Sequence, residues 1–256
     1  MRQERSQEEL LQDLIEIEAD DGLIAGAFLV LIGAILNAIG ITQVLLTKSP
    51  RGAEGVIIGN GVASIGNVMQ AVAKEELYFS KKLKGHHSGM IGSLTQAVGN
   101  AGTAVVVSEG LDFGLFSFSY TRSQEQRTVN TDAEESEASR ERSEILRRIT
   151  EVYALTDFIQ GVGAYIEGNS ILSLPPYETQ QMKATGDYIT AIGSFIQAFG
   201  LFLALSDESK EIENAVLQVI GSWIQVIGSS QGISATGTQS VLHTQKYRYS
   251  YRRHTT

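Results

Sequence analysis

Residues 192–200 read IGSFIQAFG, and near-copies of this nine-residue stretch recur along the whole chain. Each copy is centred on a glycine with small residues seven positions before and after it. A spacing of seven keeps residues on one face of an α-helix, because two helical turns take about 7.2 residues. The triplets are Gly26-Gly33-Gly40, Gly59-Gly66-Ala73, Gly85-Gly92-Gly99, Ala154-Gly161-Gly168, Gly186-Gly193-Gly200 and Asn214-Gly221-Gly228. The pattern therefore predicts six helices.

The six copies fall into two sets of three. The central glycines Gly33, Gly66 and Gly92 precede Gly161, Gly193 and Gly221 by 128, 127 and 129 residues. A near-constant offset of this kind is typical of an internal duplication. We therefore predict an all-α, internally duplicated six-helix bundle made of two three-helix repeats.

The repeated glycines need a compensating interaction. A glycine inside a helix costs about 1 kcal/mol relative to alanine, so the aligned glycines together cost on the order of 15 kcal/mol, as much as the net stability of a domain. Close approach of helix backbones can offset this cost, and a seven-residue repeat favours near-antiparallel crossing. The residues predicted to pack in this way are Gly33, Gly66, Gly92, Gly161, Gly193 and Gly221.

Two further positions of the repeat are regular when the central glycine is taken as heptad position a. Isoleucine precedes the glycine at position g in five copies, and a side-chain amide follows it at position e, about 40° away on the helical wheel. The amides are Asn37, Gln70, Gln96, Gln197 and Gln225. We expect them to serve structure, either by hydrogen bonding a neighbouring helix or by simple solvation.

Aromatic residues alternate with other residues at two places, 116–120 and 247–251, which predicts one short β-strand at the end of each half. We expect the two strands to pair, and the alternative for the second is a disordered basic tail. The predicted domains are residues 1–121 and 145–256, each a three-helix repeat plus strand, joined by a charged linker or exposed helix start at 122–144. The halves are expected to pack as one unit.

Composition excludes several classes of function. The formal net charge of -9 argues against nucleic-acid binding, and zero cysteines exclude disulfides and thiolate metal sites. His86 and His87 are adjacent and point different ways on any regular element, so a solvated loop pair is expected rather than a metal site. Glu151 and Asp157 are expected to be solvated helix charges. Without a nucleophile motif or phosphate loop, we predict no enzyme, no cofactor, no metal and no identified small-molecule substrate.

Two hypotheses about function come from different classes. The first is a soluble, non-enzymatic structural or interaction protein, self-associating through its strands. Residues 1–21 carry eight acidic residues and two arginines, so we expect no secretory signal and a cytoplasmic location. The second hypothesis is a membrane-associated or membrane-inserting protein, because residues 22–47 carry no charge and are long enough to span a bilayer. Against it, each unpaired glutamine in hydrocarbon costs several kcal/mol.

The stretch GSWIQVIG at residues 221–228, together with 192–200, resembles a repetitive, glycine- and isoleucine-rich family from spore-forming Gram-positive bacteria. All six copies share the resemblance, although the fourth has Tyr165 in place of the amide. The resemblance implies a repeat protein of unknown function and transfers no catalytic residue.

Overall fold

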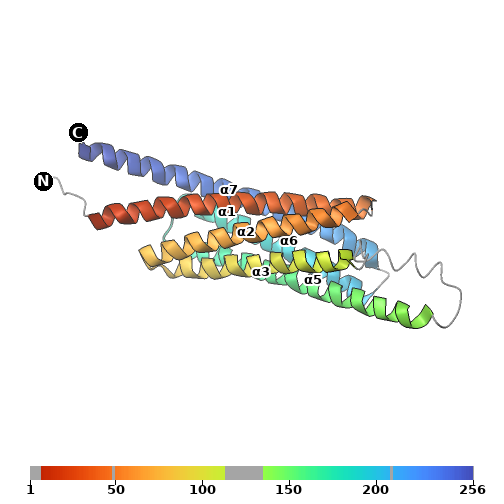
Figure 1. Ribbon diagram of the computed structural model, residues 1–256. Coiled ribbons are helices and arrows are strands. Elements are labelled where there is room, and N and C mark those ends of the chain that lie inside the picture. Colours follow the sequence, from red (N-terminus) through yellow and green to blue (C-terminus); the bar gives the residue numbers. More distant parts are fainter. Residues whose placement is uncertain (1–6, 48–49, 113–134, 208–209, 256) are drawn as a thin grey trace.

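The computed structural model describes residues 7–47, 50–112, 135–207 and 210–255, and nearly all of these are helical (Figure 1). The helices are α1 (Gln7–Thr47), α2 (Pro50–Lys81), α3 (Lys84–Asp112), α5 (Glu135–Leu172), α6 (Gln180–Ser206) and α7 (Glu211–Thr255). The described residues therefore form an all-α bundle of six helices. Residues 7–21, which carry most of the acidic residues at the start of the chain, belong to α1.

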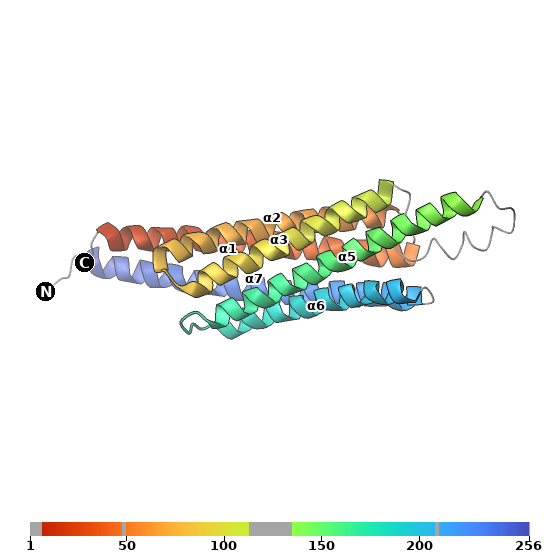
Figure 2. The same cartoon turned by 90° about the horizontal axis from the view of Figure 1, so that it is seen from below.

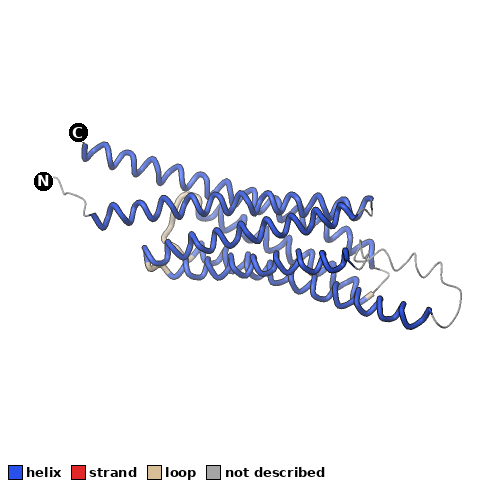
Figure 3. Tube along the Cα trace, viewed as in Figure 1, coloured by secondary structure: helices blue, strands red, loops and turns tan. Residues whose placement is uncertain are grey.

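The prediction of one β-strand at the end of each half is wrong. Residues 247–251 lie inside α7, and no strand occurs in the described ranges (Figure 3). The other predicted strand, at 115–120, lies outside the described residues. Tyr247 and Tyr251 are also four residues apart, a spacing that fits one helix face. Continuing an existing helix satisfies the backbone hydrogen bonds locally, whereas a strand needs a partner edge.

The helices close into a ring in which each helix packs on two neighbours, in the order α1, α2, α3, α5, α6, α7 and back to α1. Neighbouring helices run in opposite directions (Figures 1 and 2). The ring is closed by α1 and α7, where Asp20 pairs with His243 and the Trp223 indole donates a hydrogen bond to Thr42 Oγ1. Both termini lie at one end of the ring, which we call the terminus end.

Three pairs of neighbouring helices meet glycine against glycine, along contact lines that we call the glycine seams. The opposed residues are Gly26 with Gly66, Gly33 with Gly59 and Gly40 with Gly52 between α1 and α2; Gly92 with Gly163 between α3 and α5; and Gly186 with Gly228 and Gly193 with Gly221 between α6 and α7. A Cβ atom on Gly193 would lie 2.6 Å from the Gly221 carbonyl oxygen. The two backbones are therefore in direct contact at these positions.

The six central glycines are all buried, but they do not all face a backbone. Five of them lie against the backbone of a neighbouring helix, and a Cβ on Gly161 would instead lie 2.6 Å from Cε1 of the Phe195 ring. The backbone contact of α5 is made by Gly163, two residues further along. The fourth copy therefore uses a different register from the others.

The seams place polar residues inside the ring and apolar residues outside it. Positions e and g lie on opposite sides of the seam glycine, at about +40° and -100° on the helical wheel. In the structure position e faces inward and position g faces outward. Gln197 is thus only 1% exposed, while Ile65 and Ile192 are 59% and 53% exposed. The isoleucines at position g therefore belong to the outer surface of the ring.

A small buried apolar cluster of Ala19, Leu23, Ala73 and Leu77 lies between α1 and α2 near the terminus end. The larger apolar cluster lies at the opposite end. It is formed by side chains from all six helices: Ile41, Val56, Val107, Ile149 and Leu201 are buried, and Val219 is packed against them. These residues fill the space between the helices at that level. The ring is therefore sealed at the far end.

We expect Gly193→Ala to lower the free energy of unfolding by about 1–3 kcal/mol, because the new methyl group meets the Gly221 backbone. The matched control is Gly61→Ala in α2, where a Cβ meets nothing within 4 Å. Gly61→Ala should raise stability by up to about 1 kcal/mol through helix propensity. Thermal unfolding of both variants checks the contrast, and a Gly193→Ala protein as stable as Gly61→Ala would contradict close packing at the seam.

Candidate functional site

The repeat amides lie inside the ring and most of them bond across helices. Asn60 donates a hydrogen bond to Asn37 Oδ1 at 3.1 Å, and Gln225 donates to the side-chain oxygens of Gln197 and Ser194. Gln70 is buried beside Gly26, on the α1–α2 seam. These contacts link α1 to α2 and α6 to α7 by side chains as well as by the glycine seams.

The fifth amide, Gln96, belongs to a group of four interior residues that we call the charged cluster: Lys74, Ser93, Gln96 and Glu167. Lys74 of α2 forms an ion pair with Glu167 of α5, and both residues are buried, at 5% and 2% exposure. The other carboxylate oxygen of Glu167 accepts hydrogen bonds from Ser93 at 2.9 Å and Gln96 at 2.8 Å, both from α3. Three helices are thus joined through one buried carboxylate.

Two more charged residues lie one helical turn apart on α6. Lys183 is 8% exposed, and Asp187 has a buried carboxylate oxygen, Oδ2, with no hydrogen-bond partner among the described residues. Both line a small cavity of about 30 Å³ next to Glu167, which is large enough for a water molecule. The interior therefore holds two lysines, Lys74 and Lys183, and two acidic side chains, Glu167 and Asp187, close to one another.

The expectation that Asp157 is solvated is wrong, because this residue is buried inside the ring. The Thr103 hydroxyl donates a long hydrogen bond of 3.4 Å to its Oδ1 atom. Glu151, in contrast, is exposed, as expected. The two carboxylates lie on different faces of α5 and do not form one site.

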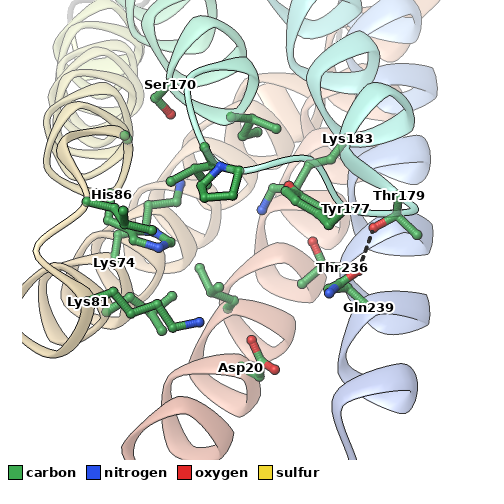
Figure 4. A pocket seen from close by; sticks show the side chains of 18 of the residues that line it. Asp20, Lys74, Lys81, His86, Ser170, Tyr177, Thr179, Lys183, Thr236 and Gln239 are labelled. Atoms are coloured by element: carbon green, nitrogen blue, oxygen red, sulfur yellow. Dashed lines mark hydrogen bonds between the residues drawn. The ribbon is translucent and has the colours of Figure 1, made fainter. Parts of the chain in front are cut away.

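A cavity of about 270 Å³, which we call the mouth cavity, opens at the terminus end above the charged cluster. Residues from all six helices line it, including Glu16, Lys74, His86, Ser170, Lys183 and Thr236. Figure 4 shows Lys74 and His86 on one side of this space and Lys183, Tyr177 and Thr236 on the other. Lys183 and Thr236 also line the smaller cavity, so the two spaces adjoin.

The rim of the mouth cavity carries one ion pair and one contact between a histidine and a carboxylate. Lys81 Nζ lies 3.0 Å from Glu16 Oε2, and His243 Nδ1 lies 2.7 Å from Asp20 Oδ2. Both join α1 to a neighbouring helix. They leave the rim with no net charge when His243 is protonated.

The loop between α5 and α6 forms part of the cavity wall. Pro175 and Pro176 cannot continue α5, and the loop brings Tyr177 over the space. Burial raises the pKa of the Tyr177 phenol well above its usual value, and the carboxylates of Asp187 and Glu167 add to this effect. The phenol is therefore neutral at physiological pH and can donate a hydrogen bond.

His86 and His87 lie at the start of α3 and not in a loop, because α3 begins at Lys84. His86 lines the mouth cavity, whereas the His87 ring lies 5.1 Å from the Tyr78 ring. In the described part of the chain, no three histidine or carboxylate residues are grouped in a way that could hold a metal ion.

Sequence reasoning missed Lys74, Glu167, Lys183 and Asp187. Glu167 is an isolated charge in a helix segment that is otherwise uncharged, whereas Lys74 precedes Glu75 and Glu76, and Lys183 and Asp187 are four residues apart. The isolation of Glu167 is the available signal, because an ionisable residue in an otherwise apolar helix faces an interior or a partner. The sequence could flag Glu167, but it could not show that the four residues meet.

A family model described as a family of unknown function (DUF6944) matches residues 21–128 and 144–233. The chain belongs to this family. The matched segments include parts of all six helices and all four residues of the charged cluster. No curated protein and no solved structure matches the chain. Membership of DUF6944 is consistent with the unknown function implied by the resemblance, and it supplies no ligand or activity.

We expect Lys74→Met to lower the free energy of unfolding of this DUF6944 protein by about 3–5 kcal/mol, because Glu167 would stay buried without its partner. Adding Glu167→Gln to Lys74→Met should recover part of the loss. The control is Lys81→Met, whose rim ion pair is partly exposed and should contribute about 1 kcal/mol or less. Equal effects of Lys74→Met and Lys81→Met on thermal unfolding would contradict a buried pair.

Proposed function

We propose that this protein is a membrane-inserted ring of helices that holds a small polar or charged solute in its interior. The observation that carries the proposal is the distribution of side chains: polar groups face the interior and large apolar groups face outward. A water-soluble bundle has the opposite arrangement. The proposal is the membrane alternative among the two hypotheses raised by the sequence, and it replaces the soluble bundle as the favoured one.

Every helix contributes large apolar side chains to the outer surface. One example from each helix, in chain order, is Ile39, Ile65, Val98, Phe158, Phe199 and Ile227, and each of these is more than a third exposed. Scattered exposed apolar residues are normal on soluble proteins, but a continuous apolar belt around all sides is not. The belt is suited to contact with lipid chains.

The thickness of the belt agrees with that of a bilayer. Charged residues are missing from 55–73 in α2 and from 88–108 in α3, which correspond to about 28 and 31 Å of helix. In α5, residues 152–168 carry only two charges, Asp157 and Glu167, and both are buried. The hydrocarbon core of a bilayer is about 30 Å thick.

Length and composition also support membrane insertion. Four helices, α1, α2, α3 and α6, are long and apolar enough to cross a membrane. The other two, α5 and α7, are more polar overall, but their polar residues between 152 and 168 and between 214 and 229 largely face the interior. The ring supplies partners for most of these groups, which removes the objection that unpaired glutamines cannot lie in hydrocarbon.

Two further hypotheses from the sequence, the internal duplication and the non-enzymatic role, remain in this proposal, and one is dropped. We infer that the ring comes from an internal duplication, since each half supplies three consecutive helices. The protein is proposed to be non-enzymatic, with a binding role. Self-association through paired strands is not part of the proposal, because residues 247–251 are helical.

We expect the protein to remain in the membrane fraction after an alkaline carbonate wash and to float with lipid vesicles. Ile192→Lys should reduce the inserted fraction strongly, because a lysine facing the bilayer centre costs about 2.5–3.5 kcal/mol. The control is Ile212→Lys, at an exposed position beside Glu213 near the end of the ring. Recovery of the wild-type protein in the soluble fraction, or equal insertion of both variants, would overturn the proposal.

Single cysteines in this cysteine-free chain test the inside-out arrangement. We expect a charged methanethiosulfonate reagent to modify Thr236→Cys in the mouth cavity but not Ile227→Cys on the outer surface, when the protein is in vesicles. If the protein were in water instead, Ile227→Cys should react faster, because Ile227 is far more exposed than Thr236. Mass spectrometry after reaction measures the two rates, and faster labelling at position 227 would contradict the proposal.

A further inference from the structure

We propose that the mouth cavity binds a small organic carboxylate, with the Lys183 ammonium group as its charge partner. The inference rests on the proposed function, since it names the class of solute held inside the ring. It comes from the lack of a direct partner for Lys183, the Tyr177 phenol beside it and the apolar remainder of the wall.

Lys183 is the lysine at the cavity that has no direct partner among the described residues. Glu16 and Lys74 form ion pairs with Lys81 and Glu167, and Asp20 contacts His243, which also contacts Gln239. Lys183 lines the same space, and no ion pair or hydrogen bond joins its ammonium group to another residue of the described ranges. An ammonium group that is largely buried without a direct partner costs free energy, and a bound anion would remove that cost.

A neutral donor lies beside Lys183. Figure 4 shows Tyr177 and Thr236 on the same side of the space as Lys183. The Tyr177 phenol can donate to a carboxylate oxygen, whereas the Thr236 hydroxyl already donates to the Gly232 carbonyl oxygen at 2.9 Å. Lys183 also lies in the first turn of α6, where the helix dipole favours negative charge. A carboxylate held there would receive one ionic contact and one neutral hydrogen bond.

The rest of the wall is apolar and favours an organic anion over an inorganic one. Leu23, Leu77, Ile171, Leu174 and Ala235 line the cavity together with the two prolines of the α5–α6 loop. A compact, strongly hydrated anion such as phosphate gains nothing from such surfaces. A carboxylate with an apolar body can place its charge on Lys183 and its body against these side chains.

A nearby carboxylate limits the charge of the ligand. Glu167 interacts electrostatically with Lys183. The Glu167 carboxylate repels an anion in the cavity, so a ligand with a single negative charge is favoured over one with two. A ligand cation is not favoured, because the carboxylates that line the mouth cavity itself, Glu16 and Asp20, already have partners.

A carboxylate with an apolar body can reach this cavity from two sources. It can be a water-soluble acid that enters from the aqueous phase, or a fatty acid that enters from the bilayer. Benzoate represents the first source and oleate the second. Benzamide is the neutral analogue that keeps the apolar body and removes the charge.

The test is calorimetric titration of the purified full-length protein in micelles of a neutral detergent, with benzoate, benzamide, oleate and inorganic phosphate. We expect binding of benzoate or oleate, no measurable binding of benzamide, and weaker binding of phosphate. Tighter binding of benzoate indicates an aqueous source and tighter binding of oleate indicates a lipid source. Equal binding of benzoate and benzamide, or no binding of either carboxylate, would overturn the proposal.

Substitutions at Lys183 test whether this residue binds the carboxylate. Lys183→Met should weaken carboxylate binding about tenfold or more, because it removes a charge-assisted contact. Lys210→Met, an equal loss of charge at an exposed position near the far end, should leave binding unchanged. Unchanged binding by Lys183→Met would overturn the assignment. If Lys183→Met does not fold, Lys183→Gln, which keeps a hydrogen-bond donor and removes the charge, decides: at least tenfold weaker carboxylate binding supports the proposal, and unchanged binding overturns it.

Failure of this inference can be told apart from failure of the proposed function. Vesicle flotation measures membrane insertion independently of any ligand. A protein that floats but binds neither carboxylate overturns only the ligand assignment. A protein that binds a carboxylate but remains in the soluble fraction overturns membrane insertion and leaves the cavity as a binding site.

Discussion

Direct contact between helix backbones at the glycine seams is the constraint on which the rest of this structure depends. At Gly33, Gly66 and Gly193 there is no room for even a methyl group, so the rotation of each helix about its own axis is fixed. Once that rotation is fixed, position e must face the interior and position g must face outward. The polar interior and the apolar outer surface are both consequences of where the glycines lie.

A polar interior makes the charged cluster possible. Lys74 and Glu167 lie on helices that are not neighbours in the ring, and α3, which lies between those helices, supplies Ser93 and Gln96 as further partners. A buried ion pair of this kind contributes little net stability, because desolvation of both ions opposes their attraction. Its consequence is specificity: the carboxylate is satisfied only when α2, α3 and α5 are all in place.

The interior changes in character along its length, which suits binding better than free passage. The mouth cavity opens at the terminus end, the charged cluster lies below it, and the amides and Asp157 follow. The apolar cluster around Ile41, Val107 and Leu201 closes the far end. In the proposed function, a solute would enter from this end and meet Lys183. Passage through the ring would require the apolar cluster to open.

The sequence by itself indicated that the chain is largely helical and, at five of the six central glycines, where helix backbones meet, because glycine at seven-residue spacing marks one face of a helix. It did not place the contact of α5, which Gly163 makes instead of Gly161. The aromatic pattern at 247–251 gave a wrong prediction of a strand. Tyr247, Tyr249 and Tyr251 alternate as in a strand, but Tyr247 and Tyr251 also have the four-residue spacing of one helix face. The sequence could not say which side of each seam is inside, since the heptad is equally consistent with isoleucine inside or glutamine inside. That choice depends on how six helices close into a ring, and so does the meeting of Lys74, Glu167 and Lys183 from three different helices. Their separation along the chain is large, and only tertiary structure decides which distant residues become neighbours.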